Sequence, residues 1–96
     1  MHRFIEWDKS KADSNYSKHG VRFEIAARVF DDPLAVSIQD RSENGELRWQ
    51  SLGMVDGFLL LLVAHTVRDD EDTPEVLRII SARRPTKQEK QRYEND

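Results

Sequence analysis

The segment Phe58–Val67 constrains the fold most strongly, because it is apolar on both faces as far as Val63. A strand with one face in water alternates apolar and polar residues, so a run without alternation is typical of a strand in the middle of a sheet. The preceding pair, Asp56-Gly57, is a strong signal for a tight hairpin turn. We therefore predict a central strand joined through this hairpin to a strand over Leu47–Val55, which carries Trp49.

Three further segments have the composition of strands. Leu34–Ile38 alternates apolar with polar or small residues, which predicts a half-buried strand. Strands are also predicted over Arg3–Trp7 and Glu75–Arg83. The connections are a polar segment, Asp40–Glu46, which contains an Asn-Gly turn signal, and an acidic loop, Asp69–Pro74. Four consecutive strands joined by short links predict an antiparallel meander.

The first predicted helix covers Lys9–His19. Asp8 precedes it as the N-cap, and Gly20 follows as the usual left-handed stop. Its only apolar residues are Ala12 and Tyr16. The helix should therefore lie on the surface with one narrow stripe buried.

Two more helices complete the α+β fold. Phe23–Phe30 places four apolar side chains on one face and ends before Asp31-Asp32-Pro33, since the residue before proline disfavours helical geometry. Thr86 and Glu89 have the spacing of a capping box and begin a C-terminal helix. The predicted order is β-α-α-β-β-β-β-α, with the helices packed on a small antiparallel sheet in a single domain over residues 1–96.

The bulk composition is typical of one small domain, because 38% of the 96 residues are hydrophobic and 34% are charged. The absence of cysteine excludes disulfides and thiolate chemistry. The N-terminus lacks the apolar region of a signal peptide, and the longest apolar run, Phe58–Ala64, is far shorter than the roughly 20 residues that span a bilayer. We therefore expect a cytosolic protein without a membrane partner.

A basic segment near the C-terminus contrasts with an otherwise acidic chain. Residues 78–92 contain six basic side chains and one acidic side chain, whereas the whole chain has a net charge of −3. Arginine binds phosphate oxygens with a planar fork that stays charged, so Arg83 and Arg84 are candidate phosphate ligands. The alternative is a solvated helix face, or a surface that docks an acidic partner, and this applies most directly to cations such as Lys87.

His65 and His19 are the candidate proton-transfer groups, because imidazole exchanges protons near neutral pH. His65 shares a strand face with Leu61 and Val63, where it either points into a cleft or forms a hydrogen bond at the rim of the core. Strict alternation puts Arg68 on the opposite face, so His65 and Arg68 can serve one site only if a bulge or twist intervenes. The three histidines are scattered without partners at ligand spacing, so no metal site is expected.

Three other positions have two interpretations each. Lys18 and His19 either complement the dipole at the end of the first helix or provide a base and a phosphate contact. Trp49 is first of all a core anchor, and stacking of a nucleic-acid base on its ring is the alternative. Tyr93 either anchors the last helix or acts as an acid, and we favour the anchor.

An ordered set of short motifs runs nearly from end to end of the chain. They are Phe4-Ile5-Glu6-Trp7-Asp8 with Lys11, Lys18-His19-Gly20-Val21, Phe23-Glu24 with Ala26-Ala27, Asp31-Asp32-Pro33, Arg48-Trp49 with Gly53, His65-Thr66 with Arg68, and Arg78–Arg84 with Glu89 and Tyr93. Together they resemble the BrnT-type toxins of bacterial type II toxin–antitoxin systems. Arg22, Pro85 and the acidic segment Asp69–Glu75 depart from the family pattern, and the last places negative charge near a surface expected to meet RNA.

The resemblance implies a RelE-like fold and a metal-independent endoribonuclease that arrests growth and needs no cofactor. It also implies neutralisation by a cognate BrnA-type antitoxin, with operator DNA contacted only through the antitoxin and a heterotetramer built on an antitoxin dimer as a compatible assembly. The alternative function is a non-catalytic binding module whose basic C-terminal helix recognises a protein partner or operator DNA. The residues expected to be catalytic are His65, Arg83, Arg68 and His19, and those expected to bind RNA are Lys18, Arg84, Lys87 and Trp49.

Overall fold

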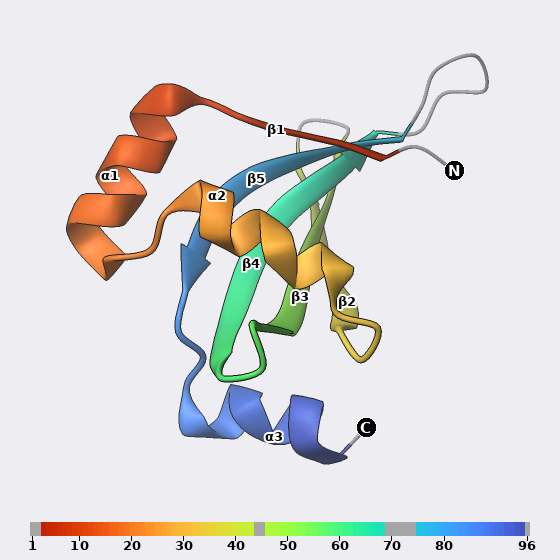
Figure 1. Ribbon diagram of the computed structural model, residues 1–96. Coiled ribbons are helices and arrows are strands. Elements are labelled where there is room, and N and C mark those ends of the chain that lie inside the picture. Colours follow the sequence, from red (N-terminus) through yellow and green to blue (C-terminus); the bar gives the residue numbers. More distant parts are fainter. Residues whose placement is uncertain (1–2, 44–45, 69–74, 96) are drawn as a thin grey trace.

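The computed structural model describes residues 3–43, 46–68 and 75–95. In chain order the elements are β1 (Arg3–Trp7), α1 (Lys9–His19), α2 (Phe23–Ala26), the 3₁₀-helix η1 (Ala27–Asp31), β2 (Val36–Glu43), β3 (Glu46–Val55), β4 (Leu59–Arg68), β5 (Glu75–Arg83) and α3 (Lys87–Asn95). They form one five-stranded sheet, with α2 and η1 crossing one face, α1 beside β5 and α3 at one end of the strands (Figure 1).

The strand order in the sheet is β1-β5-β4-β3-β2. β2 to β5 form the predicted antiparallel meander, and β4 lies in the middle, as its two apolar faces indicate. β1 adds to β5 in parallel, from Arg3 opposite Glu75 to Trp7 opposite Ile79, so the sheet is mixed and not wholly antiparallel as the sequence predicted. This edge strand therefore ends before β5 does, and no described strand pairs with the last residues of β5 on that side.

The core lies between the sheet and the helices α2 and η1. Phe23 and Leu61 are fully buried there, and the ring of Trp7 meets that of Phe23 edge to face with 6.0 Å between centroids. Burying an apolar side chain of this size stabilises the fold by roughly 1.5–3 kcal/mol. Gly53 lets η1 approach β3 closely, because a Cβ at this position would lie 2.7 Å from Cγ1 of Val29.

Two predicted elements differ from the observed ones. The helix expected over Phe23–Phe30 is a single α-helical turn followed by a 3₁₀-helix that ends at Asp31, a tightening that is common where helices end. β2 begins at Val36 and runs to Glu43, so most of the expected connection Asp40–Glu46 is strand. β3 causes this extension, because it supplies backbone partners along the polar segment. The Asn-Gly pair and the acidic loop at 69–74 lie outside the described residues.

A bulge interrupts the pairing of β4 with β5. The register shifts after Ala64, and Ile80 in β5 is the extra residue. β4 itself keeps its alternation, so the bulge does not bring His65 and Arg68 together. His65 lies on the face covered by α2 and η1, which we call the helix face, whereas Arg68 lies on the opposite, open face.

Asn15 joins α1 to β5 where β1 has ended. Its side-chain amide donates to the carbonyl of Ala82 at 2.8 Å, and its Oδ1 accepts from the N–H of Ala82 at 3.0 Å, much as a neighbouring strand would. The amide also donates to the carbonyl of Val21 at 3.1 Å. The buried stripe of α1 is therefore centred on a polar residue, whereas Tyr16, expected in the stripe, is 46% exposed. Burial of an amide is tolerated because its hydrogen bonds are made.

The predicted caps of α1 and α3 are both formed. Asp8 accepts from the N–H of Lys11, and Gly20 ends α1 with a left-handed φ of 70°. At α3, the hydroxyl of Thr86 accepts from the N–H of Glu89 at 3.1 Å, and the Glu89 carboxylate accepts from the N–H of Thr86 at 2.8 Å. Within residues 3–43, 46–68 and 75–95, no helix has the length and apolar character to cross a membrane.

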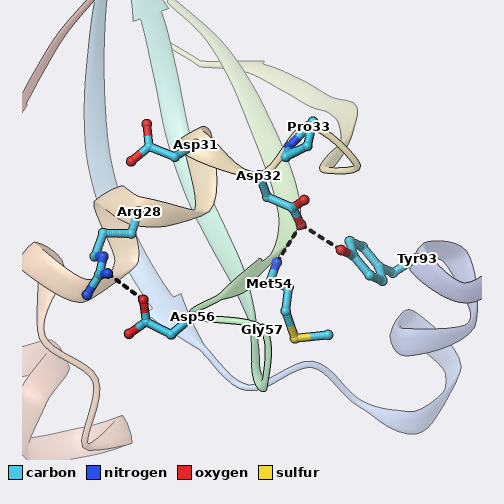
Figure 2. Close-up of a pocket in the computed structure, with 8 residues that line it drawn as sticks. All are labelled: Arg28, Asp31, Asp32, Pro33, Met54, Asp56, Gly57 and Tyr93. Carbon is cyan, nitrogen blue, oxygen red and sulfur yellow. Dashed lines mark hydrogen bonds and ion pairs between the residues drawn. The ribbon is translucent and has the colours of Figure 1, made fainter.

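Two polar contacts hold α3, none of whose described side chains is buried. Arg83 donates two parallel hydrogen bonds to Glu89, at 2.8 and 2.9 Å. Tyr93 donates to the Oδ2 atom of Asp32 at 2.6 Å, and the same oxygen accepts from the N–H of Met54 at 2.8 Å (Figure 2). We call these two contacts the α3 anchor. Tyr93 is thus the helix anchor that the sequence favours.

The α3 anchor shifts the pKa values of its four groups. Burial alone would raise the pKa of Asp32, but the hydrogen bonds from Tyr93 and from two backbone N–H groups lower it below its ordinary value. The bond to Asp32 is also the main reason why the pKa of Tyr93 is raised. Hydrogen bonding by Arg83 lowers the pKa of Glu89 to about 2 and raises the pKa of Arg83 in turn. Both contacts are therefore strongest with ionised carboxylates.

Candidate active site

Two hollows meet at His19, at the edge of the sheet where α1 lies beside β5. The first has a volume of about 370 Å³ and lies between the end of α1 and the residue that follows β5, Arg84. The cation of Arg22 covers the ring of Tyr16 on its wall, 4.3 Å from the ring centroid. The lining residues are Tyr16, His19, Gly20, Val21, Arg22, Ile25, Leu59 and Arg84.

The second hollow has a volume of about 250 Å³ and lies between α1 and the bulge of β5. Lys11, Asn15 and Lys18 reach it from one face of α1, since they follow the helical spacing i, i+4, i+7. The lining residues are Ser10, Lys11, Ser14, Asn15, Lys18, His19, Ile80 and Ser81.

The name basic edge is used here for Lys11, Lys18, His19 and Arg84. None of the described residues that line the two hollows is a carboxylate. Within the described part of the chain, these four side chains have no ion-pair partner, and all four are exposed. Lys11, Lys18 and Arg84 are three cations without a neighbouring carboxylate among the described residues, and they create a local positive potential even in a chain whose net charge is −3.

The hollow beside α3 has the opposite chemistry (Figure 2). Asp31, Asp32 and Asp56 line it, with Arg28 as their cationic neighbour. Arg28 forms an ion pair with Asp56, and Asp32 is occupied by the α3 anchor. Among the described residues, no group of three or more His, Cys, Asp or Glu side chains is arranged to hold a metal ion.

Arg83, one of the two arginines that the sequence suggested as phosphate ligands, is engaged inside the protein. Its guanidinium binds Glu89 in the bidentate geometry that a phosphate would require, and it also donates to the carbonyl of Arg84 at 3.2 Å. Its side chain is 36% exposed. Arg83 therefore connects β5 to α3, and an alanine there would remove a structural contact as well as a cation.

His65 and Trp49 lie together on the helix face, opposite one another in neighbouring strands. His65 is 4% exposed, its Nε2 lies 2.7 Å from the hydroxyl of Ser51, and its ring meets that of Phe30 edge to face with 4.8 Å between centroids. Of its two interpretations, the geometry matches a hydrogen bond at the core. Trp49 is half-buried on this packed face, as a core anchor would be.

Arg68 and Lys87 occupy two further places. Arg68 lies on the open face within 3.9 Å of Glu6, a carboxylate that also binds Arg78 at 3.2 Å. Lys87 is exposed at the start of α3. Of the eight residues selected from sequence, only Lys18, His19 and Arg84 come together on the exposed surface, at the basic edge.

Sequence reasoning assigned no site role to Lys11 and no structural role to Asn15. The spacing of Lys11, Asn15 and Lys18 on one helix face was the available signal. The spacing alone did not show what this helix face packs against, because the sequence does not indicate that it contacts β5 beyond the end of β1.

A family model described as "Ribonuclease toxin, BrnT, of type II toxin-antitoxin system" matches residues 7–89. The chain belongs to this family. The matched range of this BrnT-family chain contains the basic edge, both hollows and Arg83, and the family resemblance seen in the sequence is confirmed.

The fold of this BrnT-family chain is similar to the 1.1 Å crystal structure of the Brucella abortus ribonuclease toxin BrnT. The TM-score is 0.66, with 21% sequence identity over 91% of this chain and 100% of that chain. This likeness confirms the predicted α+β fold. Curated protein sequences give no match.

Proposed function

We propose that this protein is the toxin of a type II toxin–antitoxin system, which cleaves RNA internally in the cytosol without a metal ion and so arrests growth. Its membership of the BrnT family of ribonuclease toxins, across residues 7–89, carries the proposal. The basic edge supports it, because the imidazole of His19 lies between two hollows whose described lining residues include ammonium and guanidinium groups and no carboxylate.

In the proposed reaction, the 2′-oxygen of one nucleotide attacks its 3′-phosphorus while the bond from phosphorus to the next 5′-oxygen breaks. The products are a 2′,3′-cyclic phosphate and a 5′-hydroxyl. A base must take the 2′-proton, and an acid must protonate the leaving oxygen. We assign the base to His19 and the acid to a water molecule in the open hollow. Arg84 and Lys18 stabilise the charge that builds up on the phosphate.

The other candidates are assigned according to where they lie. Arg83 and Arg68 bind the RNA backbone on the open face, and Arg83 does so when a phosphate takes the place of Glu89. His65 and Trp49 act indirectly, by packing β4 and β3 on the helix face. Lys87 adds to the general attraction of RNA, which salt weakens.

The proposed partner is a BrnA-type antitoxin that neutralises the toxin by covering the basic edge. Operator DNA is contacted through the antitoxin alone, and two toxins joined by an antitoxin dimer give a heterotetramer. Co-expression should restore growth and yield a co-purifying complex. Reversing charge with Lys18→Glu should weaken this complex, and an unchanged complex would remove the basic edge from the interface.

Incubation of the purified protein with end-labelled RNA in excess EDTA tests the nuclease. Wild type should produce fragments that end in 2′,3′-cyclic phosphate, and His19→Ala should cleave at least about 100-fold more slowly because its base is lost. His19 is exposed, so this variant should keep the wild-type melting temperature. Lys90→Ala is the matched control, since Lys90 is exposed on α3 outside both hollows.

The failures of this assay are informative. Cleavage that requires an added divalent metal would contradict the metal-free reaction. Intact RNA from folded wild type leads to the same assay with translating ribosomes, which detects a ribosome-dependent nuclease. If the RNA also stays intact in the assay with ribosomes, the nuclease is rejected. The alternative is then a non-catalytic binding module that uses its basic C-terminal helix.

A further inference from the structure

The second hollow contains a cation, Lys11, to which the proposed reaction gives no role. Lys11 lies seven positions before Lys18 on the same face of α1, so the two are about 10 Å apart along the helix axis. Both line the hollow, and its lining contains no carboxylate in the part of the chain that the structure describes. Three hydroxyl groups surround them, from Ser10, Ser14 and Ser81.

The walls of this hollow are fixed by the fold. Asn15 lies between the two lysines and makes three hydrogen bonds to backbone groups, two of them to Ala82 in β5. The opposite wall is the bulge of β5 at Ile80 and Ser81, and bulges turn side chains away from the regular sheet direction. The cations therefore project from a preformed support.

The same helix offers an internal comparison. Lys9 lies two positions before Lys11, so the two side chains lie on opposite sides of α1. Lys9 lines a different hollow, which also contains Asp13 and Glu24. Two carboxylates thus balance the charges of Lys9 and of Arg22, which lines the same hollow, whereas none of the described residues that line the hollow of Lys11 is a carboxylate. Affinity for an anion is expected on the Lys11 side only.

We propose that the hollow of Lys11 binds a backbone phosphate of single-stranded RNA next to the phosphate that is cleaved at His19. This inference rests on the proposed function and names a second subsite of the same substrate. His19 lines both hollows, so a strand that crosses it places neighbouring phosphates in the two. The ammonium of Lys11 and the hydroxyls of Ser14 and Ser81 donate to that phosphate. The subsite strengthens binding of longer RNA and leaves bond cleavage unchanged.

Binding is tested with Lys11→Gln and its matched control Lys9→Gln, which change the same charge on the same helix. The probe is a fluorescein-labelled oligonucleotide of about ten 2′-O-methyl nucleotides, a length within the site sizes of single-strand binders. It lacks the attacking hydroxyl and stays intact. Lys11→Gln should raise Kd roughly 10-fold and reduce the slope of log K against log salt by about 0.7, the value for one phosphate contact on a single strand. Lys9→Gln should match wild type.

Cleavage gives a second readout. Lys11→Gln should raise KM for a cleavable RNA of the same length with kcat unchanged, and it should cleave a dinucleotide as wild type does. Equal effects of the two variants, a kcat loss confined to Lys11→Gln, or no binding by wild type would overturn the subsite. Binding that depends on Lys11 in a protein that never cleaves RNA would instead support the subsite and reject the nuclease.

Discussion

The basic edge and the α3 anchor each contain an arginine, but only the arginine of the α3 anchor is paired with a carboxylate of the described residues. At the α3 anchor, Arg83 is matched to Glu89 and Tyr93 to Asp32, and the neighbouring Arg28 is matched to Asp56. At the basic edge, the cations line two hollows that have no carboxylate among their described residues. The difference teaches that the number of charges in a segment does not locate a binding site. A cation that is paired internally must exchange its partner to bind a phosphate, whereas a cation without a partner binds directly.

The largest effect is expected from Asn15→Ala, which should detach α1 and with it the basic edge. The substitution leaves the N–H and C=O of Ala82 and the C=O of Val21 without their partner. Unfolding free energy in urea should fall by about 2–4 kcal/mol, since several buried groups lose hydrogen bonds at once. Ser14→Ala, one position away on the surface, should stay within about 0.5 kcal/mol of wild type. Equal stability of the two variants would show that Asn15 does not hold α1.

Removing a charge from the basic edge should affect RNA cleavage more than removing one from α3. Arg84→Gln should reduce kcat/KM by roughly 10- to 100-fold, because a cation that stabilises the transition state is lost. Arg92→Gln removes the same charge from the exposed face of α3 and should cost less than about 2-fold. If Arg92→Gln reduced kcat/KM more than Arg84→Gln does, the RNA-cleaving site would lie at α3 and not at the basic edge.

Glu89→Gln tests the paired state through its pH dependence. The pKa of Glu89 falls from 4.5 to about 2 on folding, so its contribution to stability is complete above pH 4.5 and is lost as the pH falls toward 2. Between these values, wild type should lose about 1–2 kcal/mol more than Glu89→Gln, a figure reduced for the partial exposure of Arg83.

A glutamine at position 89 still forms the capping box with Thr86. The difference in pH-dependent stability between wild type and Glu89→Gln therefore measures the ion pair with Arg83. Glu94→Gln, on the exposed surface of the same helix, should follow the wild-type pH profile. Acid unfolding curves of the three proteins make the measurement. Coincident curves for Glu89→Gln and wild type would mean that the ion pair adds no stability.

The smallest effect is expected from Tyr93→Phe, which removes the hydrogen bond to Asp32. Stability at neutral pH should fall by about 0.5–1.5 kcal/mol, the net value of one such bond. Tyr16→Phe is the control, because it keeps the ring under Arg22 and should change stability by no more than about 0.5 kcal/mol. RNA cleavage should be unchanged in both, since neither removes a cation. A Tyr93→Phe protein as stable as the control would leave α3 held by Arg83 alone.

Patterns that act over short distances determined most of the fold. The run without alternation located the central strand β4, and the spacing of Thr86 and Glu89 located the start of α3. Asp8 and Gly20 marked the two ends of α1. Each of these features depends on neighbours within a few residues, so sequence alone carries the information. The candidate site was harder to predict from the sequence, because its residues come from α1 and from the end of β5, which are far apart in the chain.

By itself, the sequence determined most of the secondary structure, the meander, the family and the basic character of residues 78–92. The tertiary structure decided which cations are available. Only the packed chain shows that β1 stops opposite Ile79, that Asn15 takes its place beside Ala82, and that Lys11 and Lys18 thereby face β5. It also pairs Arg83 with Glu89. The reason is physical: charge and helical period are properties of a segment, whereas pairing and exposure depend on contacts between segments far apart in the chain.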